Sequence, residues 1–468
     1  MSNYNAKKFA GLIAGIVVFL IIFLMPDLAG LSHEGKTAIG LLIAGIILWV
    51  TQAMPLCVSG LLLMFLLPYF GVLPDFNTVY GKFISSTLFF VMGCYGFTAA
   101  LQNSEIPTRA VGFIMRWSKG SSKKVIFGFM VFAGVLSMVC SNIAACSMLM
   151  SFCLALFEAN ELKKGESNFA KALLLGVVFS VGIGGGMLLC GTAVNPMLVG
   201  IIESSFGYSV SFLDWAIMGI PMGIIMIPLT FLILTLVCKP EPIKQDSIDS
   251  AVRQAEELGP WKRADITKLA VIVVVLILWI LSTWIPALNT TVVAIIGLII
   301  MFLPIPGLHL ITWKEYNESM SWDTIVLMGS VTAVAAGLTA TGAADWLVGL
   351  VAGGGITDPI IALLLASIIA GVIHMVVPIG PAVIGLLAIP LVGMAGAAGL
   401  AFAPMMIVIS WWASSAYMVP LDCVCLVTLS YGWYTMGDHY KYGVATHVLM
   451  IIYTVTALPL VCMLAGLW

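Results

Sequence analysis

The chain consists of long apolar runs separated by short polar stretches, and most runs are about as long as a membrane-spanning helix. A helix that crosses a bilayer needs about 20 predominantly apolar residues. Several runs are too short or too rich in glycine to cross alone, so we expect about eleven transmembrane helices plus re-entrant segments. The predicted fold is therefore an all-α polytopic membrane protein. The candidate runs begin near Phe9, Thr37, Leu56, Phe83, Val125, Ala170, Trp215, Leu269, Val292, Thr324, Ile360, Met405 and Val444.

Composition agrees with this pattern. Hydrophobic residues make up 61% of the 468 residues, charged residues make up 9%, and the mean hydropathy is +1.11. A soluble domain carries about a quarter charged residues, so most of this surface must face lipid, and no basic patch suggests a nucleic-acid partner. The first run follows Lys7 and Lys8 and resembles a signal peptide, but no small-residue cleavage pattern follows it. We therefore expect an uncleaved first span.

Basic residues indicate how the runs are oriented. We place the N-terminus in the cytoplasm and treat residues 125–160 and 359–397 as two hairpins that each enter and leave on one side. The cytoplasmic segments then contain 18 of the 20 lysines and arginines, and only Lys36 and Lys82 lie outside. Cytoplasmic loops of membrane proteins carry an excess of Lys and Arg. The sequence therefore predicts a multi-pass protein of the inner (cytoplasmic) membrane with a cytoplasmic N-terminus.

One long polar segment divides the chain into two halves. Residues 239–268 hold six basic and six acidic side chains, which we interpret as a solvated linker with a short surface helix. Residues 85–93 correspond to residues 321–329, and an Asp–Gly pair five positions apart recurs late in each half. Two related halves that begin on opposite sides of the membrane are common in secondary transporters. The predicted organisation is an N-terminal segment with the first span at 1–36, a first inverted repeat at 37–238, a cytoplasmic linker at 239–268 and a second inverted repeat at 269–468.

Two interruptions occur in the apolar runs of the first half. In hydrocarbon every backbone N–H and C=O needs a partner, so a broken helix occurs where it lines a cavity or packs against protein. The first interruption, at 137–145, offers serine and asparagine oxygens that suit a hard cation, beside a helix N-terminus that suits an anion. The second, at 182–196, contains five glycines and a proline, and we expect it to unwind the helix. Ordinary packing between membrane helices is the alternative for both segments.

Two further interruptions occur in the second half, at 374–381 and 414–423. Two prolines three positions apart break the helix in the first of them. His374 precedes these prolines and is a candidate proton carrier, although such a histidine more often bonds a neighbouring carbonyl. Asp422 is the one carboxylate within an otherwise apolar run, and a charge at bilayer depth costs about 2.5–3.5 kcal/mol or more. Asp422 should therefore face a partner or a water-filled cavity.

On these residues the sequence resembles the divalent anion/sodium symporter (DASS) family of the wider ion-transporter superfamily, over roughly residues 35–465. The family fold implies scaffold and transport domains in each protomer of a homodimer, with an elevator-like slide of the transport domain. It also implies two hairpins whose Ser-Asn-Thr tips meet near the midplane and help to form Na⁺ and carboxylate sites. The matching features are Ser141-Asn142, Gly191-Thr192 through Asn195, the pairs Asp214…Gly219 and Asp438…Gly443, and Met418-Val419-Pro420.

The resemblance implies roles for individual residues. The first Na⁺ would be held by Ser137, Ser141, Asn142 and a turn at 184–186 that includes Gly185. Ile143 stands where the family motif has Thr, so one hydroxyl for the substrate is absent. The implied substrate-binding residues are Ser141, Asn142, Ile143, Thr192, Asn195, Ile379, Gly380, Pro381, Asp422 and Cys423.

The second half departs from the family pattern. No alignment of the second hairpin tip supplies Ser or Asn, and Val424-Cys425-Leu426 replaces the Pro-Pro-Asn of the second unwound helix. In one interpretation Asp422 is itself a second cation ligand or a proton acceptor, which gives a proton- or one-sodium-coupled carrier. In the other, cation coupling is lost and the protein exchanges one anion for another. A carboxylate beside an anion site repels the substrate unless it is protonated or paired, which favours a coupled proton or metal ion.

The predicted function is secondary active transport of a small anion, a di- or tricarboxylate, by elevator-type alternating access coupled to Na⁺ or H⁺. The alternatives are a cation-independent anion exchanger and, with less support, an anion channel. Na⁺ at one site is the only cofactor expected, and the expected partners are the anionic substrate, the bilayer and a second copy of the chain. An enzyme is disfavoured because the sequence holds no phosphate loop, metal cluster or nucleophilic triad. Its five histidines are widely separated: His33, His309, His374, His439 and His447.

Overall fold

The computed structural model describes residues 2–285, 287–305 and 309–468, with side chains from residue 6 onward. Within these ranges eleven helices are long and apolar enough to cross a membrane, by length and composition. This confirms the expected all-α polytopic fold. The helices up to the linker are α1 (Ser2–Leu24), α2 (His33–Val50), α3 (Leu56–Tyr69), α4 (Phe76–Phe83), α5 (Ser86–Gln102), α6 (Ile106–Ser118), α7 (Ser122–Ser137), α8 (Asn142–Ala159), α9 (Asn168–Met187), α10 (Val194–Phe206), α11 (Phe212–Cys238) and α12 (Gln245–Glu256).

The helices after the linker follow the same order as those before it. In each half two helices joined by a short turn precede an interrupted helix, and a long helix follows the interruption. The boundaries of the two repeats and their inverted orientation stay predictions. The helices of this part are α13 (Arg263–Leu281), α14 (Thr290–Met301), α15 (Trp313–Ser319), α16 (Trp322–Ala340), α17 (Ala343–Ala352), α18 (Pro359–Val376), α19 (Gly380–Ala397), α20 (Phe402–Ser414), α21 (Cys423–Leu429) and α22 (Met436–Ala465).

Corresponding helices of the two halves begin with the same kind of cap. Ser85 and Ser321 precede α5 and α16, and each hydroxyl accepts a hydrogen bond from the backbone N–H three residues ahead. Ser211 and Thr435 cap α11 and α22 in the same way. A Ser or Thr at this position satisfies a backbone donor that the helix leaves unpaired. The repeated sequence segments thus begin the same elements in each half.

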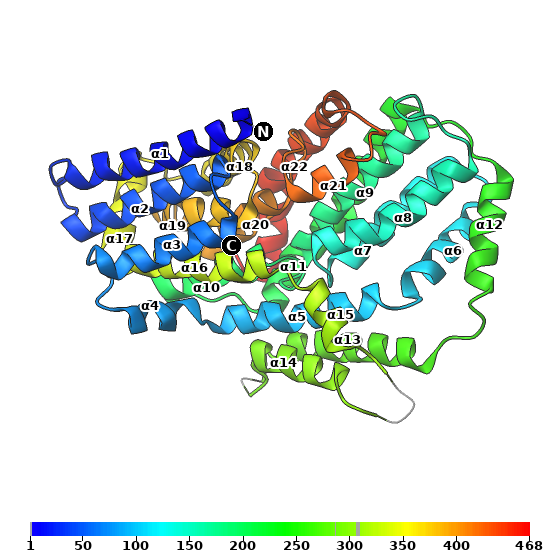
Figure 1. Cartoon of the computed structure of the whole chain (residues 1–468), viewed down its shortest axis with the longest axis horizontal. Helices are drawn as coiled ribbons and strands as arrows, with labels where there is room; N and C mark the ends of the chain where they lie inside the picture. Colours follow the sequence, from blue (N-terminus) through cyan, green and yellow to red (C-terminus); the bar gives the residue numbers. More distant parts are fainter. Residues whose placement is uncertain (1, 286, 306–308) are drawn as a thin grey trace.

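Figure 1 shows two groups of helices that meet in the middle of the molecule. One group contains α1–α4 with α16, α17 and α19, the other contains α6–α9, α11, α12 and α22, and α10 and α20 pack where the groups meet. The apolar stretch of α9 is 94% buried inside the protein, whereas that of α1 is 17% buried. Helix α9 is therefore a central element, and α1 leaves most of its surface for lipid.

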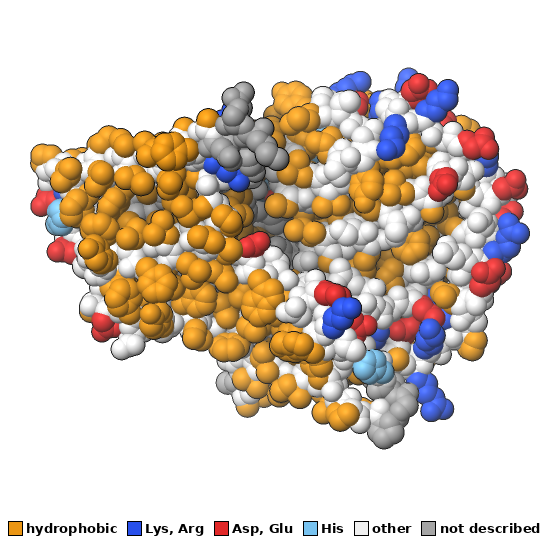
Figure 2. Space-filling model, viewed as in Figure 1, with side chains coloured by type: hydrophobic (Ala, Val, Ile, Leu, Met, Phe, Trp, Pro, Cys, Tyr) orange, Lys and Arg blue, Asp and Glu red, His pale blue; other side chains and the backbone are white. Residues whose placement is uncertain are grey.

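Charged side chains are distributed unevenly over the surface. Figure 2 shows hydrophobic side chains covering the part of the molecule built from α1–α4, whereas charged side chains of both signs gather toward the end that carries α12. Helix α1 begins near the middle of the molecule and runs away from that charged end. A charged surface is expected outside the hydrocarbon layer because charges in lipid are costly.

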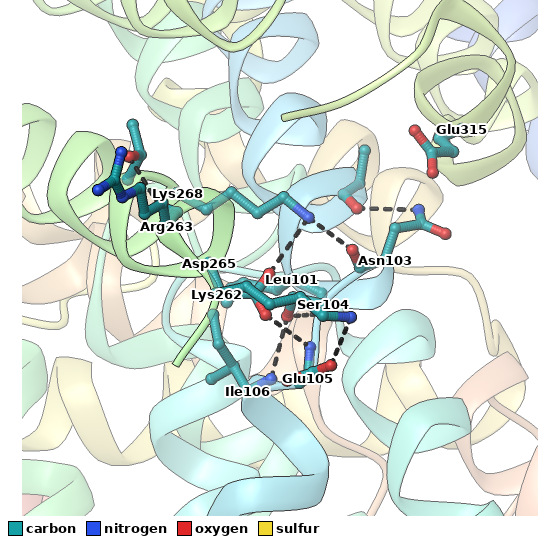
Figure 3. A network of polar contacts seen from close by, with 12 residues as sticks. Leu101, Asn103, Ser104, Glu105, Ile106, Lys262, Arg263, Asp265, Lys268 and Glu315 are labelled. Atoms are coloured by element: carbon teal, nitrogen blue, oxygen red, sulfur yellow. Dashed lines mark hydrogen bonds and ion pairs between the residues drawn. The ribbon is translucent and has the colours of Figure 1, made fainter. Parts of the chain in front are cut away.

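The polar linker is fastened to the turn between α5 and α6 (Figure 3). Glu105 pairs with Lys262 at 2.6 Å and with Arg109 at 2.8 Å. Arg109 also donates hydrogen bonds to the backbone carbonyls of residues 258, 259 and 260, and its guanidinium lies over the ring of Trp261. Three charges and several backbone groups thus join the linker to the first half.

A buried ion pair continues this contact into the start of α13. Lys268 and Asp265 are each 3% exposed, and their charged atoms are 3.6 Å apart. Lys268 donates a hydrogen bond to the carbonyl of Asn103, and Asp265 accepts one from the backbone N–H of Glu105 (Figure 3). Breaking such a pair by removing one partner is strongly unfavourable, so α13 and the end of α5 are held together.

Candidate functional site

The four interruptions lie next to one another in the structure. The amide of Asn142, at the tip of the α7–α8 hairpin, donates a hydrogen bond to the carbonyl of Ser414 at 3.4 Å. A β-carbon on Gly380, at the tip of the α18–α19 hairpin, would lie 2.5 Å from the carbonyl oxygen of Ala413 and 2.8 Å from Val194. Both tips therefore contact the interrupted helices directly. The breaks between helices are at residues 138–141, 188–193, 377–379 and 415–422.

A cavity of about 400 Å³ lies where these breaks meet. This volume is in the usual range for sites that bind small molecules. Of the ten predicted substrate-binding residues, nine line the cavity: Ser141, Asn142, Ile143, Thr192, Ile379, Gly380, Pro381, Asp422 and Cys423. The structure thus brings together residues from four segments that are far apart in the sequence, although their binding role stays a proposal.

Three long helices present their N-termini to the cavity. The first residues of α8, α10 and α19 are all part of its wall. Ser141 caps α8 by accepting a hydrogen bond from the N–H of Ala144, whereas α10 and α19 have no side-chain cap. In α10 the N–H of Asn195 bonds the carbonyl of Thr192 and Pro196 has no N–H, so it is the partial positive charge of the helix N-termini that favours an anion here. The backbone of this wall therefore suits an anionic ligand.

The ionisable side chains on the cavity wall are acidic. Among the described lining residues there are three carboxylates and no Lys, Arg or His. Glu318 and Asp323 are exposed, whereas the Asp422 side chain is 17% exposed. Electrostatic attraction for an anion must therefore come from the helix N-termini and from any bound cation, because no basic side chain of the wall supplies it.

Asp422 occupies the start of α21 and faces a histidine. Its Oδ1 atom accepts a hydrogen bond from the N–H of Val424 at 2.9 Å. Its Oδ2 atom lies 3.8 Å from Nε2 of His374, which is 3% exposed. This distance is too long for a hydrogen bond, and neither ring nitrogen of His374 finds a partner among the described residues. His374 is not part of the main cavity wall but lines a small cavity behind it, so it contacts the site through Asp422.

Oxygen atoms of the first hairpin and of the α9–α10 break converge beside Gly185. Asn142 Oδ1 accepts a hydrogen bond from the Ser137 hydroxyl at 2.8 Å and lies against Gly185. A β-carbon on Gly185 would not fit beside this oxygen. A β-carbon on Gly191 would lie 2.5 Å from the carbonyl oxygen of Gly185 and 2.9 Å from that of Ser137. Transporters use such amide and backbone oxygens at broken helices to coordinate Na⁺. The residues present fit a sodium ion at this point.

The glycine run does not unwind where the sequence suggested. Helix α9 continues through residues 182–186 to Met187, and the irregular segment begins only at 188. The glycines instead allow close packing, since Gly184 lies against the backbone of Gly134, and Gly186 lies against the Trp411 ring. The expected turn at 184–186 is therefore helical, and the break that shapes the site follows it.

Asn195 has a different place from the one expected. It is fully buried and is not among the residues that line the main cavity. Its amide nitrogen donates hydrogen bonds to the carbonyls of Gly185 (2.9 Å) and Leu188 (2.8 Å), and its oxygen accepts one from the Ser410 hydroxyl. Asn195 thus holds the α9–α10 break in shape and connects it to α20.

One side of the cavity was not predicted from the sequence. This side comes from α5 and from the α15–α16 corner, which contain no interruption within an apolar run. The repeated segment at 321–329 could have indicated this side of the cavity, because its first residues lie on the wall. The polar residues of this side are Tyr95, Gln102, Glu318, Ser319, Ser321, Asp323 and Thr324.

Comparison with known proteins identifies the family of this chain. The family model described as the sodium:sulfate symporter transmembrane region matches residues 6–468. The sodium-dependent dicarboxylate transporter SdcS of Staphylococcus saprophyticus is 29% identical over 369 residues, which cover 74% of this chain and 70% of that protein. SdcS of Staphylococcus aureus is 28% identical over 365 residues, with the same two coverages.

A solved structure shows a similar fold. The Alcanivorax borkumensis YdaH transporter gives a TM-score of 0.58 at 13% identity, over 84% of this chain and 88% of that chain. The family match covers nearly the whole chain and bears out the resemblance to divalent anion/sodium symporters. The protein is therefore a multi-pass secondary anion transporter rather than an enzyme, and it belongs to the sodium:sulfate symporter transmembrane region family.

Proposed function

We propose that this protein moves a small dicarboxylate together with Na⁺ across the plasma membrane of a bacterial cell. The observation that carries the proposal is the meeting of two hairpin tips and two broken helices around one cavity of about 400 Å³. The names of the bacterial SdcS relatives support both the dicarboxylate and the sodium ion. Helix N-termini on a wall without basic side chains among its described residues support an anion whose charge is balanced by a cation.

The sodium ion would be held by Asn142 Oδ1 and by the carbonyl oxygens of Ser137 and Gly185, with Ser141 beside them. These oxygens lie close together because Gly185 and Gly191 have no side chain to keep them apart. Each carbonyl oxygen has two lone pairs, so the hydrogen bond from Asn195 to Gly185 leaves one free. A cation there places positive charge next to the cavity.

Movement of the site would follow the elevator scheme. The transport domain would contain the two hairpins and the interrupted helices with α11 and α22, and the other membrane helices would form the scaffold. The function would be carried out by a homodimer with a cytoplasmic N-terminus. The charged end at α12 supports this orientation, because cytoplasmic surfaces are enriched in Lys and Arg.

Cation-independent exchange is the second candidate function. The tip of the second hairpin, at 377–381, contains no side-chain oxygen, so a second sodium site like the first has no side-chain ligand there. Asp422 is the nearby group that could take the place of such ligands, by binding a cation or a proton. An exchanger would need neither a bound cation nor a proton. Its transport would depend on an anion on the opposite side of the membrane.

Uptake into proteoliposomes tests these alternatives. Labelled succinate, malate, citrate and sulfate would be offered with an inward Na⁺ gradient, with an inward H⁺ gradient, or with internal unlabelled anion. Acceleration of dicarboxylate uptake by Na⁺ without internal anion is the expected result. Uptake that ignores both gradients and requires internal anion would replace symport by exchange. Uptake that follows voltage alone and shows no counterflow would indicate a channel.

Orientation and oligomeric state can be measured on the same protein. Cysteines placed at Lys119 and Asp75 are expected to react with an impermeant thiol reagent from opposite sides of the membrane, with Lys119→Cys labelled from the cytoplasm. Labelling of both from one side would contradict the topology. Mass photometry in detergent should give a particle of two chains, and a single-chain particle that retains transport would contradict the homodimer.

A further inference from the structure

A second large hollow lies on the outer surface of the protein, at the base of the first hairpin. It is a groove of about 330 Å³ that forms where the end of α6, the start of α7 and the second half of α11 come together. Its described lining consists of five apolar side chains and two lysines, none of which belongs to the central cavity. The rings of Phe127 on α7 and Phe231 on α11 meet edge-on within it, with their centroids 5.0 Å apart.

The two lysines of this groove lack an anionic partner. Lys123 and Lys124 lie in the first turn of α7, which contains no acidic side chain. Both are exposed, and neither forms an ion pair with a carboxylate of the described residues. The Lys124 ammonium lies 5.8 Å from the centre of the Trp117 ring. Positive side chains in the first turn of a helix are disfavoured by the helix dipole, so the stability of α7 does not explain this pair.

The groove has a charged end and an apolar end. Residues 116–124 contain four basic side chains and no acidic one, and Gly112 of the same helix, α6, lies against Ala255 of α12 at the charged end of the molecule. Beyond the lysines the lining is apolar, and Leu232 and Leu236 of α11 remain exposed there. Exposed leucines on a membrane-spanning helix face hydrocarbon. A ligand that fits both ends must therefore combine a negative group with a hydrocarbon chain.

We propose that this groove binds an anionic phospholipid, whose phosphate pairs with Lys123 and Lys124. The acyl chain lies along Phe127, Phe231 and Leu232. Basic pockets between membrane helices bind the head groups of anionic lipids. A second copy of the chain fits less well, because the described lining holds two positive charges and no negative one, and a face-to-face contact would bring like charges together. The proposal does not depend on which substrate the protein transports.

Native mass spectrometry of the full-length protein in detergent tests the charged end. With phosphatidylglycerol and phosphatidylcholine of identical chains offered together, the wild type is expected to bind phosphatidylglycerol about tenfold more tightly. The double variant Lys123→Gln with Lys124→Gln should bind the two lipids within about twofold of each other. The matched control is Lys163→Gln with Lys164→Gln, another adjacent and exposed pair that lies outside the groove. It removes the same charge and should retain the wild-type preference.

A substitution that fills the groove tests the apolar end. Leu232→Trp should lower the affinity for phosphatidylglycerol by about tenfold with both lysines in place. Leu236→Trp is the control, because it lies one turn later on α11 at an exposed position outside the groove. The midpoint of thermal unfolding without lipid shows whether each variant folds, and Leu232 is exposed enough to accept a larger side chain. Added phosphatidylglycerol should raise this midpoint in the wild type and in Leu236→Trp but not in Leu232→Trp.

Four results would overturn the proposal. The first is equal binding of the two lipids by the wild type, and the second is an unchanged preference in the variant that lacks Lys123 and Lys124. The third is an equal loss of preference in the control that lacks Lys163 and Lys164, which would assign the attraction to the net charge of the surface. The fourth is displacement of the lipid by glycerol 3-phosphate at an equal concentration, which would show that the acyl chain is not bound. Loss of dimers without loss of lipid in Leu232→Trp would likewise replace the lipid by a second copy of the chain.

Discussion

Gly443 of α22 lies directly against the carbonyl oxygen of Tyr417, in the break between α20 and α21, and no β-carbon would fit between them. The first half contains a matching contact, since Gly219 of α11 lies against the carbonyl oxygen of Met187, where α9 ends. In each half the long last helix thus supports the broken helix through a glycine. Glycine permits a close approach of backbones at such positions.

Gly443→Ala is expected to lower stability and abolish transport. The added methyl group must displace Tyr417 and the segment that leads to Asp422, and such overpacking costs about 1–3 kcal/mol. The measurement is the midpoint of thermal unfolding in detergent together with uptake into proteoliposomes. Gly219→Ala should behave in the same way if the two halves are equivalent.

Gly437→Ala is the matched control for this substitution. Gly437 lies in the same helix, and the nearest atom to an added β-carbon would be the Thr435 hydroxyl at 3.6 Å. Because alanine is favoured over glycine within a helix by about 0.5–1 kcal/mol, this variant should be at least as stable as the wild type. Equal loss in both variants would indicate a general effect on α22 rather than the contact with Tyr417.

Ser137→Ala is expected to weaken the apparent affinity for Na⁺. The Ser137 hydroxyl holds Asn142 Oδ1 by a buried hydrogen bond of 2.8 Å, and its loss leaves that oxygen free to rotate away from the carbonyl oxygens beside it. A buried hydrogen bond contributes about 0.5–1.5 kcal/mol, which corresponds to an increase of about two- to tenfold in the Na⁺ concentration for half-maximal uptake. Ser151→Ala on α8, whose hydroxyl only bonds its own helix at an exposed position, should leave this concentration unchanged. An unchanged Na⁺ dependence in Ser137→Ala would remove this corner as the sodium site.

Some features of the fold could be predicted from local sequence. Apolar length gives the membrane helices, and the prolines at 378 and 381 give the break between α18 and α19. The position of Asp422 followed from the cost of a charge in an apolar run, and the structure places it on the cavity wall. Each of these inferences depends on one segment and its surroundings.

Other features depend on contacts between distant segments and could not be predicted in this way. The glycines at 182–186 suggested an unwound helix, but they accommodate α7, Asn142 and Trp411 within a continuous α9. Asn195 was expected at the substrate, whereas its partners Gly185, Leu188 and Ser410 orient it into the protein. A sequence pattern shows that a residue is polar or small but does not show which neighbour requires it.

Asn195→Ala is expected to destabilise the α9–α10 break. Two carbonyls and one hydroxyl would lose their partner in a fully buried place, and an unsatisfied buried group costs about 1–3 kcal/mol. The midpoint of thermal unfolding should fall, and the Na⁺ concentration for half-maximal uptake should rise because Gly185 is no longer held. Asn168→Ala, at an exposed helix start, is the control. Normal stability with altered substrate preference would instead place Asn195 in contact with the substrate.

Glu105→Gln is expected to loosen the linker from the turn between α5 and α6. The carboxylate is bonded by Lys262 and Arg109, which in that order hold the pKa of Glu105 below its usual value. A lowered pKa means that the carboxylate contributes to stability at neutral pH, and that this contribution is lost as the pH falls through the lowered pKa. Loss of about 1 kcal/mol of stabilisation raises the fraction of molecules whose linker is detached by roughly fivefold. Trypsin should therefore cleave at Lys262 and Arg263 several-fold faster in the variant at neutral pH.

Glu257→Gln provides the comparison for this experiment. Glu257 is an exposed residue of the same linker, and the ion pairs of the described residues do not include it, so its loss should leave the cleavage rate unchanged. The effect of Glu105→Gln should also disappear in strong acid, where the wild-type carboxylate is protonated too; an acid-stable protease such as pepsin would measure this. If Glu105→Gln is cleaved at the wild-type rate at neutral pH, the carboxylate is not needed to hold the linker. The backbone contacts of Arg109 and the buried pair of Lys268 with Asp265 would then be sufficient.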